Sequence, residues 1–384
     1  MAIALHARLV GGTLSEAAPL FTRIGDSVSV PAEISGHAMF VNIMVNGHGP
    51  YRVLVDTGCS VTLVSPALAA AVGAIIEDPE ERPDVARNGL GDSIQIQRVM
   101  LASIELGGAR FEGVTAAVTD SFDRMSAIEG HRIDGALGFP LFADLFLGLD
   151  FPNHRMLLDR KWPANAPAIQ ASLTAVERND VPFVQVTIQG IPVDVMIDTG
   201  ANQALHLPSE IASALRWKEE PRAGSMFAVV GEVGREGIGR LAGSMSLGEL
   251  QQVEPTAVIS PGTASLGVRS LERFCLIFHQ SENRVWLCGA DAAPIMPTAE
   301  RSNGLSVYAA PGGWRIAGVI PGSPAEDAHM AAGSLITQIE HQSAASWTRD
   351  QMNQWINSHA EVALVVSDRS GDRALTLPVW DLVP

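Results

Sequence analysis

The string Asp-Thr-Gly occurs twice, as Asp56-Thr57-Gly58 and as Asp198-Thr199-Gly200, each time after an apolar run. One copy alone is typical of a turn in which the aspartate accepts a hydrogen bond from a nearby backbone N–H. Two copies in matched surroundings indicate chemistry instead. Two adjacent carboxyls that share one proton supply both a base and an acid, which are the groups needed to activate a water and protonate a leaving group.

The residues around the two triplets repeat in the same order, and this internal repeat predicts two similar halves. In each half, a strand, a glycine turn and a second strand lead to the triplet. A third strand and a short helix with a proline at or before its start follow. The expected strands cover 39–45, 51–55 and 61–64 in the first half and 183–188, 191–197 and 204–207 in the second, with helices at 66–72 and 210–215.

The length of 384 residues predicts two or three domains. We expect a mostly β protein whose halves, residues 36–165 and 166–293, form two lobes around a central cleft. A small β domain with two helices follows at 299–384, and its helices are expected at 324–331 and 349–358. Residues 1–35 form an N-terminal extension, with two interpretations open: it pairs across the halves, or it is a pro-segment that occludes the cleft.

Composition narrows the class of partner. The formal net charge of −16 argues against nucleic acid or an anionic membrane surface. No apolar run approaches the ~20 residues of a membrane span. The three cysteines imply no disulfide framework, although a pair between Cys275 and Cys288 stays open. No metal-ligand spacing occurs, so neither metal nor cofactor is expected. The compartment is periplasmic if a signal peptide was removed and otherwise cytoplasmic.

The two triplets, with Ala136-Leu137-Gly138 and Ser265-Leu266-Gly267 downstream, resemble the aspartic peptidases, in which each lobe supplies one Asp-Thr-Gly. The resemblance covers about residues 36–290, and the short lobes resemble those of retropepsins more than those of pepsins. It implies that Asp56 and Asp198 activate one water to hydrolyse peptide bonds of an extended polypeptide, in a monomer. It assigns supporting roles to the rest of the triplets, Thr57, Gly58, Thr199 and Gly200.

The residue after each triplet departs from the pepsin pattern. Pepsins usually have a serine or threonine there, whereas this chain has Cys59 and Ala201. A thiol is a poor hydrogen-bond donor and alanine has no side-chain donor. Because the charged form is then less stabilised, we expect activity to peak at mildly acidic or neutral pH.

Glycine-rich segments in the middle of each half are candidate flap tips over the cleft, and ordinary β-turns are the alternative. The candidate residues are Gly89, Leu90, Gly91, Gly231 and Gly234.

The segment Gly322-Ser323-Pro324-Ala325 and the strands around it resemble PDZ domains of bacterial proteases. The resemblance implies a groove between the strand at 305–309 and the helix at 349–358 that accepts an extended peptide, including a peptide C-terminus. The alternative is a domain that only packs on the peptidase. The groove candidates are Gly304, Leu305, Ser306 and Val307.

These observations predict an aspartic endopeptidase, with substrate recruited by the PDZ-like domain. A non-catalytic adaptor that binds peptides through that domain is the alternative.

Overall fold

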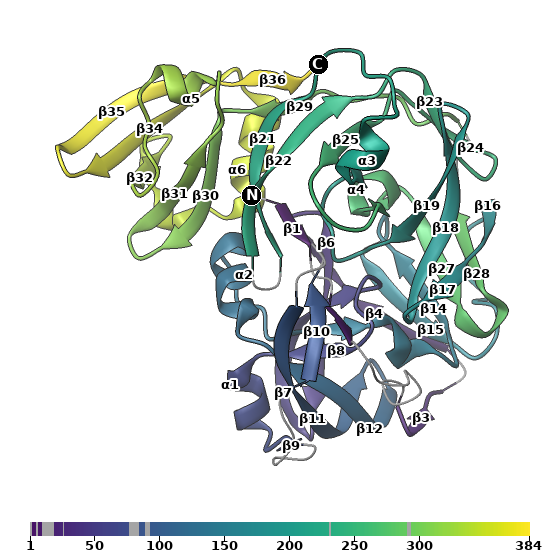
Figure 1. Ribbon diagram of the computed structural model, residues 1–384. Coiled ribbons are helices and arrows are strands. Elements are labelled where there is room, and N and C mark those ends of the chain that lie inside the picture. Colours follow the sequence, from purple (N-terminus) through teal and green to yellow (C-terminus); the bar gives the residue numbers. More distant parts are fainter. Residues whose placement is uncertain are drawn as a thin grey trace.

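The computed structural model describes residues 2–4, 7–9, 19–25, 27–76, 84–88, 93–229, 232–289 and 293–384 (Figure 1). These residues form two sheets of eleven strands, two of six and one of two, with short helices between them. The predicted mostly β fold is therefore confirmed. Within the described part of the chain, no helix is long and apolar enough to cross a membrane.

In the first half, the antiparallel strands β6 (Ala38–Val45) and β7 (His48–Asp56) deliver Asp56 to the centre of the molecule. Strand β7 is exposed at its start and buried from Val53 onward, because its last residues are apolar. Strands β8 (Thr62–Val64) and β13 (Gly135–Gly138) flank this end, and the parallel pairing of β13 with β7 sets Gly138 beside Asp56. The apolar run before the triplet is thus a buried central strand.

The predicted helix after the first triplet is confirmed. Helix α1 (Pro66–Ala71) begins where the Ser65 hydroxyl accepts a hydrogen bond from the Leu68 N–H, with Pro66 in the first helical turn.

The second half repeats this order with β18 (Val181–Ile188), β19 (Ile191–Ile197), β20 (Leu205–Leu207), α3 (Ser209–Ala212) and β26 (Ser265–Leu266). Helix α3 ends at Ala212, before the predicted end at residue 215. The reason is that the Trp217 indole N–H donates to Ala212 O and the Arg216 N–H donates to the Gln189 side chain. The Arg216 N–H and the Ala212 carbonyl, which would pair in the next helical turn, are thereby bonded to other groups.

Antiparallel strands flank each predicted flap tip. In the first half they are β10 (Asp84–Asn88) and β11 (Ser93–Leu106), and β11 also pairs with the next strand, β12 (Ala109–Val118). In the second half they are β21 (Arg222–Val229) and β22 (Glu232–Arg240), and β22 also pairs with β25 (Thr256–Ile259). Gly234 lies on β22 opposite Phe227. The other flap candidates, Gly89, Leu90, Gly91 and Gly231, lie outside the described residues.

One six-stranded sheet contains strands of both halves, in the order β16 (Ile169–Thr174), β28 (Arg284–Cys288), β27 (Cys275–His279), β14 (Phe146–Asp150), β15 (Arg155–Asp159) and β4 (Ser27–Pro31). The β14–β27 pairing joins the two halves from Phe146 opposite His279 to Asp150 opposite Cys275. A single buried apolar cluster runs through both halves. The halves therefore cannot separate without breaking backbone hydrogen bonds.

Cys275 and Cys288 face each other across β27 and β28 as free buried thiols, so the structure contains no disulfide between them. Burial, together with the charge of Asp150, raises the pKa of the Cys288 thiol to about 11.

The N-terminal residues extend the sheets of both halves. Strand β1 (Ala2–Ala4) pairs in parallel with β21, and β2 (Ala7–Leu9) pairs antiparallel with β10. Strand β5 (Glu33–Ser35) pairs with β6. Figure 1 shows β1 between the strands of the two halves. Residues 2–4 thus pair with a hairpin of the second half, and residues 7–9 pair with a hairpin of the first.

The C-terminal sheet is formed by β30 (Leu305–Ala310), β31 (Gly313–Val319), β32 (Leu335–Ile339), β34 (Glu361–Asp368) and β35 (Gly371–Pro378), with the short β33 (Gln342–Ser343) on β32. Strands β29 (Glu300–Ser302) and β36 (Trp380–Val383) pair beside it. Helix α6 (Arg349–Ser358) covers the predicted residues and starts with a capping box between Thr348 and Gln351.

Helix α5 (Pro324–Asp327) starts as predicted, with the Ser323 hydroxyl accepting from the Glu326 N–H. It ends before the predicted residue 331. His329 adopts a left-handed conformation (φ +53°), which is incompatible with a continuing helix.

Helix α2 (Ser121–Glu129), absent from the sequence-based prediction, joins the first half to the C-terminal sheet. The buried Arg349 guanidinium donates from Nε to Ile128 O at the end of α2 and from Nη2 to Val307 O on β30 at 2.9 Å. The same group lies 5.6 Å from the Trp314 ring centroid. Arg349 therefore connects α2, α6 and the edge of the C-terminal sheet.

Replacing Arg349 with methionine is expected to loosen the C-terminal sheet from the first half. The change removes both hydrogen bonds and leaves Glu129, only 2% exposed, without this nearby positive charge. The free energy that holds the C-terminal sheet to the first half should fall by about 3 kcal/mol, which is the usual cost of breaking a buried charged contact. Limited proteolysis between residues 293 and 299, ahead of β29, should become faster. Arg315→Met is the control, because Arg315 donates to Gly333 within the sheet. Equal proteolysis rates in both variants would refute this role for Arg349.

Candidate active site

The two aspartates occupy equivalent positions at the ends of β7 and β19, and both are buried: Asp56 is 1% exposed and Asp198 is 0% exposed. The Gly58 N–H donates to Asp56 Oδ1 at 2.8 Å, and the Gly200 N–H donates to Asp198 Oδ1 at 2.9 Å. Each triplet therefore orients its own carboxylate through the backbone of its glycine.

The two carboxylates lie next to each other across the junction of the halves. A Cβ atom on Gly58 would be 2.6 Å from Asp198 Oδ1, and a Cβ on Gly200 would be 2.3 Å from Asp56 Oδ2. Each carboxylate thus packs against the glycine of the opposite triplet. Glycine is required in both places because any side chain would displace the facing carboxylate.

The threonines bind the two triplets to each other by reciprocal hydrogen bonds. The Thr57 N–H donates to Thr199 Oγ1 at 3.0 Å, and the Thr199 N–H donates to Thr57 Oγ1 at 3.1 Å. Each hydroxyl also donates across the junction, from Thr57 to Ile197 O at 2.7 Å and from Thr199 to Val55 O at 2.8 Å. The supporting residues predicted from the sequence are therefore brought together with the aspartates.

The downstream glycines fix the loops that follow the triplets. A Cβ on Gly138 would lie 2.5 Å from the Val61 carbonyl, and one on Gly267 would lie 2.2 Å from Gln203 O. The residue after each glycine donates back to the loop, from Phe139 N to Cys59 O at 2.9 Å in the first half. In the second half, Val268 N donates to Ala201 O at 2.8 Å.

Cys59 points at the aspartate beside it. Its Sγ lies 3.1 Å from Asp56 Oδ2, in the direction of a donated S–H bond. The thiol thus lies in contact with Asp56 as a weak donor, and Ala201 contributes no side-chain donor in the other half. The two aspartates therefore have different neighbours, as the residues after the triplets predict.

The groove candidates of the C-terminal sheet lie far from the triplets in sequence and are already bonded. The Gly304 and Leu305 N–H groups donate to the side chains of Ser302 and Asn303. Ser306 Oγ accepts from the Met226 N–H of β21 at 3.0 Å, and Val307 O accepts from Arg349. Edge strand β30 is therefore held by β21 of the second half and by Arg349 of α6.

Among the described residues, no three His, Cys, Asp or Glu side chains are placed to hold a metal ion.

Thr199→Val is expected to destabilise the protein and reduce the activity proposed below, because it removes two of the hydrogen bonds that join the triplets. At about 1 kcal/mol for each bond, the free energy of unfolding should fall by roughly 2 kcal/mol. Chemical denaturation measures the change. Thr199→Ser keeps the hydroxyl and should behave like the unchanged protein, whereas an equal loss in both variants would refute this role of the hydroxyl.

Comparison with known proteins gives one family match. Residues 41–141, which include the first triplet, match the model of a family described as aspartyl protease. A search of curated proteins finds no match. Among solved structures, the crystal structure of basic 7S globulin from soybean aligns with a TM-score of 0.42 and 14% identity, covering 70% of this chain and 96% of that chain. The family match supports an aspartyl protease family, and with it a hydrolase that acts on peptides.

Proposed function

We propose that this chain is an aspartic endopeptidase in which Asp56 and Asp198 act as one pair. The observation that carries the proposal is the set of reciprocal threonine bonds, which sets each carboxylate against the glycine of the opposite triplet. In this proposal, residues 36–165 and 166–293 are the two lobes around the cleft. Both lobes belong to one chain, so a monomer suffices.

The chemistry follows from two close carboxyl groups, which share one proton because their charges repel. The ionised group takes a proton from a water, whose oxygen attacks the carbonyl carbon of the peptide. The protonated group donates its proton toward the carbonyl oxygen. When the C–N bond breaks, the departing nitrogen takes a proton from one carboxyl, while a hydroxyl of the tetrahedral intermediate returns a proton to the other, so that the pair again holds one proton.

An extended polypeptide is the substrate form that the strand edges support. The edges of β21 and β10 pair with β1 and β2. A substrate strand would pair with the same edges. Residues 2–4 and 7–9 therefore compete with substrate in this proposal, which supports the interpretation of the N-terminal extension as a pro-segment.

Residues 299–384 are proposed as a PDZ-like domain that recruits substrate. The support is a cavity beside β30 and α6, whose apolar wall includes Leu305, Val307, Met352 and Trp355. The N–H groups of Gly304 and Leu305 already bond to neighbouring side chains, which favours recognition of apolar side chains over a terminal carboxylate.

Asp56→Asn and Asp198→Asn should each abolish cleavage of a peptide library, with a loss of about 10²–10⁴-fold or more. Asp194→Asn is the matched control, because Asp194 is exposed on the same strand β19 as Asp198. Cleavage that survives in both active-site variants would refute the pair. Peptide binding without cleavage by the unchanged protein at any pH would favour the adaptor.

The pH profile tests the role of Cys59. A serine hydroxyl is a stronger donor to Asp56 Oδ2 than the thiol, so Cys59→Ser should stabilise the ionised pair and extend activity to lower pH. Cys59→Ala removes the donor and should restrict activity at low pH. The measurement is kcat/KM against pH for all three proteins. Three superimposable profiles would show that the thiol contact has no influence on the pair.

A further inference from the structure

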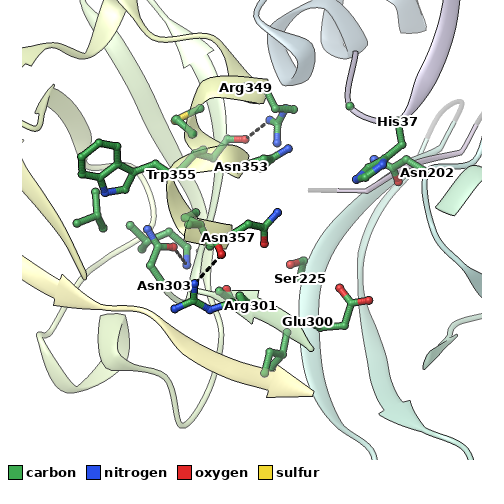
Figure 2. Close-up of a pocket in the computed structure, with 18 of the residues that line it drawn as sticks. His37, Asn202, Ser225, Glu300, Arg301, Asn303, Arg349, Asn353, Trp355 and Asn357 are labelled. Atoms are coloured by element: carbon green, nitrogen blue, oxygen red, sulfur yellow. Dashed lines mark hydrogen bonds between the residues drawn. The ribbon is translucent and has the colours of Figure 1, made fainter. Parts of the chain in front are cut away.

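A cavity of about 240 Å³ lies between the second half and the C-terminal sheet (Figure 2). Figure 2 shows Asn353, Trp355 and Asn357 of α6 on one side and His37 and Asn202 on the other. The wall from the C-terminal sheet and α6 is largely apolar, with Leu305, Val307, Met352, Trp355 and Ile356. The opposite wall is polar, with Asn202, Gln203, Ser225, Glu236, Arg269 and Glu300.

Glu236 on β22 is the unusual group in the polar wall. It is 7% exposed, and no donor among the described residues lies within hydrogen-bonding distance of its Oε2. Gln203 contributes a second buried acceptor, Oε1, that also has no donor there. A buried acceptor without a donor is costly, so a cavity lined by two of them favours a ligand that donates hydrogen bonds.

The charges around Glu236 favour a cation. Glu300 pairs with Arg269 at 2.6 Å. Burial is the main reason that the pKa of Glu236 is raised to about 8; the positive charges of the chain's amino terminus and of Arg269 act in the opposite direction, and the charge of Glu300 adds to the rise. A positively charged ligand would allow this carboxyl to ionise in place.

We propose that this cavity binds an ammonium or guanidinium group of a peptide, with Glu236 as its counter-ion and Gln203 as a second acceptor. The proposal rests on the proposed function in so far as the peptide is the substrate. The apolar wall fits the same ligand, because the methylene groups of a lysine or arginine pack on apolar surface while the charged end reaches a carboxylate.

The strand edges indicate which end of the peptide reaches the cavity. Strand β1 runs parallel to β21, with Ala2 opposite Phe227. Ser225, two residues before Phe227 on β21, lines the cavity. A peptide strand that pairs with β21 in the position of β1 therefore has its N-terminal end toward the cavity. Asn202, Gln203 and Ala204 line the cavity, so it borders the loop that follows the second triplet. The cation is thus a basic side chain, or a free α-amino group, on the N-terminal side of the bound strand.

The test measures peptide binding to the full chain carrying Asp198→Asn, so that cleavage does not interfere. Three fluorescent peptides differ only at their first residue: N-acetyl-lysine, N-acetyl-norleucine and norleucine with a free amine. At least one cationic peptide should bind roughly tenfold or more tightly than N-acetyl-norleucine. A preference for lysine assigns the site to a side chain, and a preference for the free amine assigns it to the chain terminus.

Glu236→Gln should remove this preference while leaving the affinity for N-acetyl-norleucine unchanged. Glu249→Gln, an exposed change in the same half, should keep it. Gln203→Leu provides a second, milder variant in case Glu236→Gln unfolds, and it should reduce the preference. Calorimetry at pH 7 in two buffers of different ionisation enthalpy should show proton release on binding of the cationic peptide, absent in Glu236→Gln.

Equal affinities for all three peptides, or a preference that survives Glu236→Gln, would overturn the proposal. The outcomes also distinguish a failure of this proposal from a failure of the proposed peptidase function. Cleavage by the unchanged chain without a charge preference retains the peptidase and refutes the cation site. A charge preference dependent on Glu236 without cleavage retains the site and refutes the peptidase.

Discussion

The reciprocal hydrogen bonds between Thr57 and Thr199 are the constraint on which the rest of the structure depends. Each hydroxyl bonds to the backbone of the opposite half, and the residues involved are 142 positions apart in sequence. Neither aspartate is therefore oriented by its own half alone. The shared six-stranded sheet serves the same end, because the pairing of β14 with β27 fixes the halves in one relative position.

The close approach at this junction explains which residue types the triplets need. Gly58 and Gly200 each contact the facing carboxylate at distances that exclude a Cβ atom, and the threonines supply a hydroxyl that both donates and accepts. Burial then magnifies the effect of each neighbour, since interactions between charges and dipoles strengthen where water is excluded. For this reason we expect a change as small as a thiol in place of a hydroxyl beside Asp56 to alter the chemistry of the pair.

Local patterns predicted what depends on local physics. The strands before the triplets, the capped start of α1 and the full extent of α6 all follow from periodicity and capping residues. Features set by distant contacts were missed. Helix α2 lies in a segment for which no element was predicted, although Gly130 after it is a typical helix terminator. Glu236 lies on β22, and only the tertiary arrangement of β22 near Glu300 makes it a buried carboxyl in a cavity.

The C-terminal sheet also acts on the second-half hairpin that borders this cavity. Ser306 accepts from the Met226 N–H of β21, and Arg235 of β22 donates to both Gly224 O and Val319 O at 2.9 Å. The hairpin is thus held from its outer side by strands β30 and β31. Ser225 and Glu236 lie on this same hairpin and line the cavity. A ligand in the cavity therefore contacts the hairpin that β30 and β31 hold in place. A ligand can shift the hairpin from one position to another only if it binds one of these positions more tightly. The contacts of β21 and β22 with the C-terminal sheet are where such a difference in affinity would arise.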